Sequence, residues 1–332
     1  LMAGKTLPGV YGASSPRMNV ADLRTKGWEA SVTWGDSFTL ASKPFNYRIM
    51  AGIGDNTSKV TKYDNPNRTL TDPYEGQQLG EIWGYVVDGY FKTDEEARNY
   101  KVDQSFVNQM INASALDNGL HAGDLKFVDL DGNNKIEQTT SANDRKDMKV
   151  IGNSLPRYNY NFGISADWYG IDFSVLFQGI GKQNWYPGAE TSMFWGPYSR
   201  PYASFIPSDF MSQVWSEENT NAYFPRPRGY VALGSNRELA VVNTKYLQNL
   251  AYCRLKNLSI GYTLPDKWLS KIGFEKIRVY FSGENLLTFT KLHSDYIDPE
   301  QASASNSWKT SKSDANIYPW AKTYSFGVDI TF

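Results

Sequence analysis

The sequence has few of the residues that enzymes most often use for catalysis. Its 332 residues include one cysteine and two histidines. A single cysteine excludes an internal disulfide, and Cys253 lies in a strand-like segment that favours a small packed residue over a nucleophile. No serine, cysteine or carboxylate stands in a recognisable nucleophile motif. The residues therefore favour a function other than catalysis.

Long apolar segments and an excess of charge are also absent. No run approaches the roughly 18 apolar residues that a membrane helix needs. The chain therefore either avoids the bilayer or crosses it as strands, since helices and closed barrels are the structures that span membranes. The formal net charge is -1, from 34 basic and 35 acidic residues, and no basic block stands out. Nucleic acid is therefore not an expected partner.

The clearest pattern is a strict alternation of apolar and polar residues in the last nine positions. Successive side chains of a strand leave opposite sides of the sheet, so this stretch predicts a strand with one apolar and one polar face. A large apolar residue at the very end is typical of the closing strand of an outer-membrane barrel. A terminal strand of a soluble sandwich is the alternative. The apolar positions are Tyr324, Phe326, Val328, Ile330 and Phe332.

Similar alternation recurs along the chain, and the connections between these segments differ greatly in length. The pattern predicts strands near residues 28–34, 45–53, 158–168, 171–177, 255–262 and 277–281. Short turns, such as the one at Tyr169 and Gly170, alternate with long polar stretches, as they do in outer-membrane barrels. Two short helices are expected within the long stretches, at Asp94–Tyr100 and Asp209–Ser216.

One polar stretch, residues 129–136, resembles the first half of a calcium-binding loop. Acidic and amide side chains occupy positions 1, 3 and 5, and a main-chain carbonyl follows at position 7, as in an EF-hand. The acid expected at position 12 is missing, so Asp144 or Asp147 is expected to reach back. An Asx-rich turn stabilised by its own side chains is the alternative. The predicted calcium ligands are Asp129, Asp131, Asn133, Lys135 and Asp147.

A second polar stretch, residues 179–207, is dense in aromatic residues and prolines. Exposed aromatic rings can stack on sugar rings or anchor a protein partner. So many apolar side chains must also be buried against something. We therefore interpret them as contacts for a substrate or a lid, with a loop packed on itself as the alternative. The predicted contact residues are Trp185, Tyr186, Phe194, Trp195, Tyr198 and Tyr202.

Several motifs spread over nearly the whole chain are informative through their combination and order. They are NVADLRTKGWE at 19–29, IWGYVVDGYF at 82–91, the acidic segment at 123–136, YCRLKNLSIGYTLP at 252–265, GENLLT at 283–288 and DPE at 298–300. Together they resemble the C-terminal portion of SusC/RagA-like TonB-dependent outer-membrane transporters of Bacteroidetes-like bacteria.

The resemblance implies a fold and a function. Residues 1–332 would be the C-terminal part of an all-β, transmembrane antiparallel barrel of 22 strands with long extracellular loops. The transporter would import oligosaccharides or peptides, take its energy from TonB, sit in outer-membrane lipid and work with a SusD-like surface lipoprotein as a lid. No cofactor beyond structural calcium is expected. The N-terminal plug domain and the first barrel strands of such transporters have no counterpart in this chain.

Two other functions stay open from the residues. One is a soluble β-sandwich module that binds carbohydrate through exposed aromatic rings, and the other is an all-β glycosidase, whose two carboxylates can lie far apart in the chain. Neither easily explains the terminal Phe332 or the unequal lengths of the connections.

Overall fold

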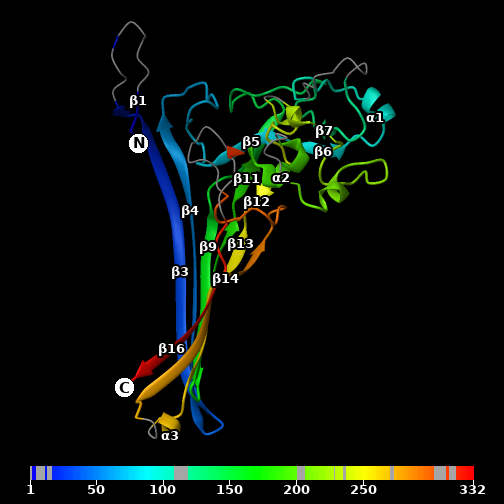
Figure 1. Cartoon of the computed structure of the whole chain (residues 1–332). Coiled ribbons are helices and arrows are strands. Elements are labelled where there is room, and N and C mark those ends of the chain that lie inside the picture. Colours follow the sequence, from blue (N-terminus) through cyan, green and yellow to red (C-terminus); the bar gives the residue numbers. More distant parts are fainter. Residues whose placement is uncertain are drawn as a thin grey trace.

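The fold is dominated by one antiparallel sheet, with loop segments packed at one end of it (Figure 1). The computed structural model describes residues 2–4, 12, 17–107, 119–199, 206–227, 229–234, 237–269, 273–302, 312–313 and 319–332. Seven strands form the sheet, and neighbours in the sheet are also successive sheet strands in the chain. They are β3 (Ala21–Leu40), β4 (Lys43–Tyr63), β9 (Arg157–Trp168), β10 (Ile171–Lys182), β13 (Tyr252–Thr263), β14 (Lys276–Thr290) and β16 (Thr323–Thr331).

The connections confirm the predicted asymmetry. At one end of the sheet the strands are joined through residues 41–42, 169–170 and 264–275, the last containing α3 (Asp266–Leu269). Tyr169 and Gly170 have φ of 51° and 84°, the left-handed values that a tight hairpin of two residues requires. At the other end the strands are joined through residues 64–156, 183–251 and 291–322. The C-terminus lies at the end with the short turns (Figure 1).

Pairing across the sheet collects apolar side chains on one face, which we call the apolar face. One row of paired residues runs through all strands from β4 to β16 and is apolar at every position. Because the sheet keeps its register, rows at two-residue spacing repeat this character. The row consists of Phe45, Trp168, Ile171, Tyr262, Val279 and Val328.

The opposite side of the sheet, which we call the polar face, carries hydroxyl, amide and charged groups. One of its rows is almost entirely serine, and between the next two rows Arg278 donates to Asp172 in an ion pair. Sheets that separate lipid from a watery lumen show this division. The serine row consists of Arg48, Ser165, Ser174, Ser259, Ser282 and Ser325.

The apolar face has the height expected of a membrane band. On β4 it runs from Phe45 to Ile53, about 27 Å along the strand at about 3.4 Å per residue. A tilt of about 40° reduces this to about 20 Å of depth, close to the roughly 25 Å band of outer-membrane barrels. Two residues beyond Ile53, Asp55 accepts a bidentate ion pair from Arg157. This paired charge lies just beyond the apolar stretch of β4, at the loop end.

The long connections contain the remaining short elements, which pair with one another. β5 (Glu81–Tyr85) pairs with β8 (Met148–Asn153), and β6 (Val87–Tyr90) pairs with β7 (Leu125–Phe127). The others are β1 (Met2–Gly4), β2 (Arg17–Asn19), β11 (Asn184–Pro187), β12 (Gln248–Asn249), β15 (Lys312–Ser313), α1 (Asp94–Arg98), α2 (Ser192–Trp195) and the 3-10 turns η2 (Gly196–Tyr198), η4 (Phe210–Gln213) and η5 (Tyr230–Leu233).

One of the two expected helices is confirmed, and the other is wrong in extent. Helix α1 begins after Thr93, whose hydroxyl accepts from the N–H of Glu96. The stretch predicted as a helix at Asp209–Ser216 forms only the single turn η4. It then becomes extended, because the Trp215 N–H donates to the Phe224 carbonyl and the Phe224 N–H donates to the Gln213 carbonyl across the loop. Among the described residues, no helix is long and apolar enough to cross a membrane.

The sheet is open, with β3 and β16 at its two edges among the strands described. The predicted terminal strand is present as β16, and its apolar residues include Phe326, which is 82% exposed. An edge strand with an apolar face needs a partner and a non-aqueous environment, because both its backbone groups and its side chains are otherwise left facing water. Closure into a barrel of 22 strands therefore stays a prediction.

A pair of adjacent substitutions tests which face of β16 meets lipid. Phe326→Arg should lower assembly of the full-length protein in outer membranes, because a charge on the lipid side costs about 2–4 kcal/mol at mid-depth. Ser325→Arg is the matched control, because its side chain lies on the polar face. Heat-modifiable migration of the folded barrel on gels gives the readout. Equal loss in both variants would contradict the assignment of the faces.

Candidate functional site

The predicted contact aromatics are buried, which corrects their interpretation as an exposed binding surface. Trp185, Tyr186, Phe194, Trp195 and Tyr198 are each at most 2% exposed. Tyr202 lies outside the described residues. The five side chains belong to a cluster of buried apolar residues from segments 85–136, 185–250 and 292–302, which we call the loop core. The loop is packed on itself, as in the alternative, but also against the other long connections.

Burial of these rings is accompanied by hydrogen bonds from their polar atoms. Trp195 Nε1 donates to the Gly188 carbonyl at 2.9 Å, and the Tyr186 hydroxyl donates to the Leu239 carbonyl at 2.8 Å. Both partners lie in the same long connection. Because a buried N–H or O–H without a partner is costly, these bonds allow the rings to be buried, and the removal of their apolar surface from water favours that burial. The loop core is therefore a stable platform beside the sheet, and its rings cannot stack on a ligand in this arrangement.

The predicted cation site brings together three carboxylates from two segments. Ligand atoms of Asp129, Asp131 and Asp147 all lie within 4.8 Å of one another. Asp147, predicted to replace the missing acid, is fully buried and accepts from the N–H groups of Leu130 and Glu137 at 2.8 and 2.7 Å. Of the two acids that the sequence offered, Asp144 and Asp147, the structure places Asp147 beside the loop.

The loop geometry supports the first positions of the calcium pattern. Asp129 accepts from the N–H groups of Gly132 and Asn134, both at 2.7 Å. Asn134, where an EF-hand has glycine, adopts the left-handed φ of 62° that this position requires. Asn133 and Lys135 are exposed on the same loop, and the Asn133 Oδ1 accepts from the Lys135 N–H at 2.8 Å. These bonds also fit an Asx-rich turn, so calcium binding stays a prediction.

The three carboxylates of this cluster give it an excess of negative charge. Burial raises the pKa of the Asp147 carboxyl, and the nearby carboxylates of Asp131 and Asp129 raise it further against the lowering effect of its two N–H donors. Burial also acts to raise the pKa of Asp129, but the N–H groups of Asn134 and Gly132 lower it below its usual value. A hard divalent cation, which prefers carboxylate oxygens, would neutralise this excess.

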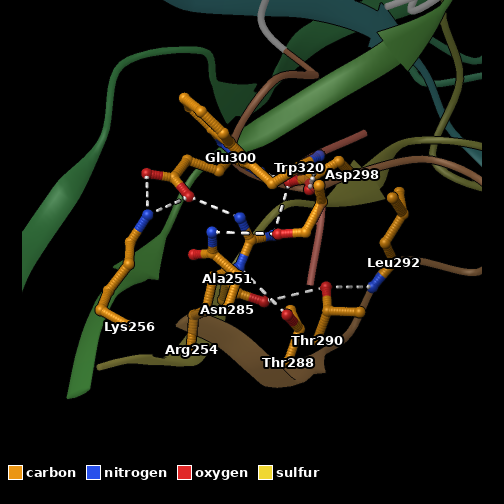
Figure 2. A network of polar contacts seen from close by, with 11 residues as sticks. Ala251, Arg254, Lys256, Asn285, Thr288, Thr290, Leu292, Asp298, Glu300 and Trp320 are labelled. Carbon is orange, nitrogen blue, oxygen red and sulfur yellow. Dashed lines mark hydrogen bonds and ion pairs between the residues drawn. The ribbon is translucent and has the colours of Figure 1, made fainter. Parts of the chain in front are cut away.

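A buried ion network that sequence reasoning missed connects the loop core to the polar face of the sheet. Arg254 of β13 has a side chain only 2% exposed. Its Nη2 donates to Asp298 Oδ1 at 2.6 Å and its Nη1 donates to Glu300 Oε2 at 2.7 Å (Figure 2). Its Nε donates to the Thr288 hydroxyl at 3.0 Å. All sides of this guanidinium therefore meet acceptors, as a buried cation requires.

The network fixes residues 291–302, which we call the strap. Lys256 Nζ donates to both carboxylate oxygens of Glu300, at 2.8 and 2.7 Å. The other oxygen of Asp298 accepts from the N–H of Trp320 at 3.3 Å. On its far side the strap joins the loop core, where Ser294 donates its hydroxyl to the Met193 carbonyl. Two features of the sequence could have indicated this network. One is Arg254 at a polar position of a strand, and the other is the acidic DPE motif at 298–300.

Comparison with known proteins shows what the chain is related to. Over its whole length it is 27% identical to TonB-dependent receptor P3 of Formosa agariphila, and 24% identical to TonB-dependent receptors P39 and P26 of the same organism. Its homologues are TonB-dependent receptors. The chain spans about a third of the length of these receptors, 31%, 32% and 31% respectively. No family model matches the chain.

Solved structures agree with this homology at the level of the fold. The chain superposes over its whole length on 31% of a chain in the RagAB peptide importer in its open-open state, with a TM-score of 0.67 and 19% identity. A second structure, of the RagAB peptide transporter, gives a TM-score of 0.64 at 18% identity and 32% of its chain. These matches confirm the mainly β fold. Together with the homology to TonB-dependent receptors, they fit the predicted resemblance to the C-terminal portion of a SusC/RagA-like transporter.

Removal of one partner tests the ion network of this TonB-dependent receptor homologue. Arg254→Met should lower the unfolding free energy of the loop end by about 3–5 kcal/mol, because it leaves two buried carboxylates without their cation. Limited proteolysis of the full-length protein should then cut the strap faster. Lys291→Met, at an exposed strap position, is the control. Adding Asp298→Asn and Glu300→Gln should recover part of the loss, and no recovery would contradict the pairing.

Calcium titration tests the acidic loop. If the predicted site binds Ca²⁺, the ion at a hundred times its dissociation constant should stabilise the chelator-treated full-length protein by about 2.7 kcal/mol, measured by calorimetry. Asp131→Asn should remove this gain while its amide oxygen still accepts the turn hydrogen bond. Asp209→Asn, an exposed acid elsewhere, should keep it. An equal response in both variants would leave the Asx-rich turn as the correct interpretation.

Proposed function

We propose that this chain supplies the C-terminal strands and extracellular loops of a 22-stranded outer-membrane barrel that imports oligosaccharides or peptides. The proposal includes energy from TonB and a SusD-like lipoprotein lid. The observation that carries it is the seven-stranded sheet with one apolar face, one polar face and all long connections at one end. Homology to TonB-dependent receptors supports it.

Each part of the chain has a role in this proposal. The apolar face contacts outer-membrane lipid and the polar face lines the lumen, since lipid provides no hydrogen-bond partners for polar groups. The loop core, supported by the strap and by Arg254, forms a rigid surface at the extracellular mouth. Because its aromatic rings are buried, lid contact falls to the exposed residues around them, such as Met211 and Tyr296.

The proposal assigns no chemical step to this chain. Its homologues are named as receptors, and the similar solved structures as an importer and a transporter. The soluble sandwich and the glycosidase remain alternatives, and experiment has to distinguish them from the transporter. Both predict a protein that stays in solution without detergent.

Purification of the full-length protein from outer membranes in mild detergent tests the proposal. We expect a SusD-like lipoprotein to co-purify in a fixed ratio, identified by mass spectrometry, and uptake by cells to stop when TonB is deleted. Deletion of β16 should abolish assembly, whereas Lys291→Met should leave it unchanged. Recovery of a detergent-free soluble protein without a lipoprotein partner would overturn the proposal in favour of the sandwich.

A further inference from the structure

The polar face contains a hollow near the loop end of the sheet. Its volume is about 1070 Å³, and it is lined mainly by residues of β3, β4, β9 and β10, together with Pro156 and Tyr252. This is slightly above the roughly 300–1,000 Å³ range of small-ligand pockets. A row of paired residues crosses its floor from Ser31 through Gly52 and Asn161 to Gln178. Glycine opens the space here, because a Cβ on Gly52 would lie 3.2 Å from the Asn161 amide nitrogen.

Four exposed residues that line this hollow carry a side-chain amide; three of them are adjacent on β9 and β10, and the fourth is Asn56. Asn159, Asn161 and Gln178 are exposed lining residues. Their amide groups make no hydrogen bond to any other residue of the described part of the chain. Each side-chain amide has an acceptor oxygen and two N–H donors. Three adjacent amides on one concave wall can therefore bond to the same ligand.

The hollow is nearly free of unpaired charge. The next position in the Asn161 row is Arg254, but Asp298 and Glu300 neutralise its guanidinium. Asp55 is likewise held by Arg157. Among the lining residues there is no lysine or arginine, and Glu29 adds one exposed carboxylate. An anionic solute would therefore find no cation here, whereas an uncharged solute would find many hydrogen-bonding groups.

We propose that this hollow binds the main chain of an extended peptide. A carboxamide presents an N–H donor beside a C=O acceptor, the same pair that a peptide group presents. Asn159 and Asn161 are two residues apart on β9, about 6.8 Å along the strand. An extended peptide lying along β9 repeats with this same spacing, so both amides meet equivalent peptide groups. Gln178 on β10 meets the same peptide from the neighbouring strand.

The aromatic residues of the lining favour a peptide over an oligosaccharide. Sugar rings are commonly bound by stacking on an exposed aromatic ring. Trp28 and Tyr160 project from the opposite, apolar face, and the third aromatic, Tyr252, is buried. The Tyr160 ring crosses Gly179 on that outer side, where its hydroxyl donates to the Tyr252 carbonyl. The hollow thus offers hydrogen bonds without a stacking platform. This inference rests on the proposed import function, because the polar face must line the lumen.

Main-chain methylation tests the proposal without altering peptide side chains. The probes are an uncharged ten-residue peptide of serine and alanine, and the same peptide with alternate main-chain nitrogens methylated. The purified full-length complex should bind the unmethylated peptide at least about tenfold more tightly by calorimetry, because several main-chain hydrogen bonds are lost on methylation. Equal binding of both peptides overturns the proposal. This comparison uses the wild-type protein and so does not depend on how variants fold.

A double substitution locates the effect. Asn161→Leu with Gln178→Leu should weaken binding of the unmethylated peptide about tenfold and remove the discrimination between the two probes. Asn257→Leu, on the same face but outside the hollow, is the matched control and should leave both unchanged. If the double variant binds the peptide like the wild type, the amides do not contact the peptide and the proposal is overturned. The hollow would then pack against another part of the protein. A neutral oligosaccharide that binds there in place of the peptide overturns it too.

Failure of this inference is separable from failure of the proposed function. Heat-modifiable migration and co-purification of the lipoprotein report on the barrel and its partner. If these are normal and the peptide results fail, only the assignment of the hollow falls. If the protein does not assemble as an outer-membrane barrel, the proposed function falls first.

Discussion

The structure depends on one constraint, which is that the strands from β4 to β16 keep a common register, so that their apolar side chains gather on one face. A slip of one residue in any strand would turn its apolar residues to the polar face. The rows that begin at Phe45 and at Arg48 show that no such slip occurs from β4 to β16, even though register shifts interrupt β10, β13 and β14 at the loop end. The two faces, and with them the proposed lipid and lumen contacts, follow from this register.

The loop end is held together by a different combination of interactions. Residues from three long connections pack into a single apolar core, and the strap ties that core to the sheet through charged groups instead of apolar contact. A charge network on the polar face is suited to this task, because a face exposed to water is poorly suited to carrying a large apolar patch. The buried Arg254 thus lies between the apolar packing of the loop core and the hydrogen-bonded polar face of the sheet.

Much of the sheet could be predicted from the sequence, because alternation and turn length are local properties. Tyr169 and Gly170 predict a hairpin, and the alternation in the last nine residues predicts β16. The environment of the residues at 185–198 could not be predicted, since their burial depends on Tyr246, Phe224 and other residues far along the chain. The Arg254 pairing was hidden for the same reason. Asp147 was predictable only because the incomplete calcium pattern called for an additional acid.

The unequal connections also bear on how the sheet forms. Three hairpins, β3–β4, β9–β10 and β13–β14, join strands that are close in sequence, so each can form with little loss of chain entropy. Pairing of β4 with β9 must instead close the loop of residues 64–156, and pairing of β10 with β13 the loop of residues 183–251. Non-local pairings of this kind are the slow steps of folding. The sheet is therefore expected to assemble by joining ready-made hairpins, with β16 added to the edge of the last one.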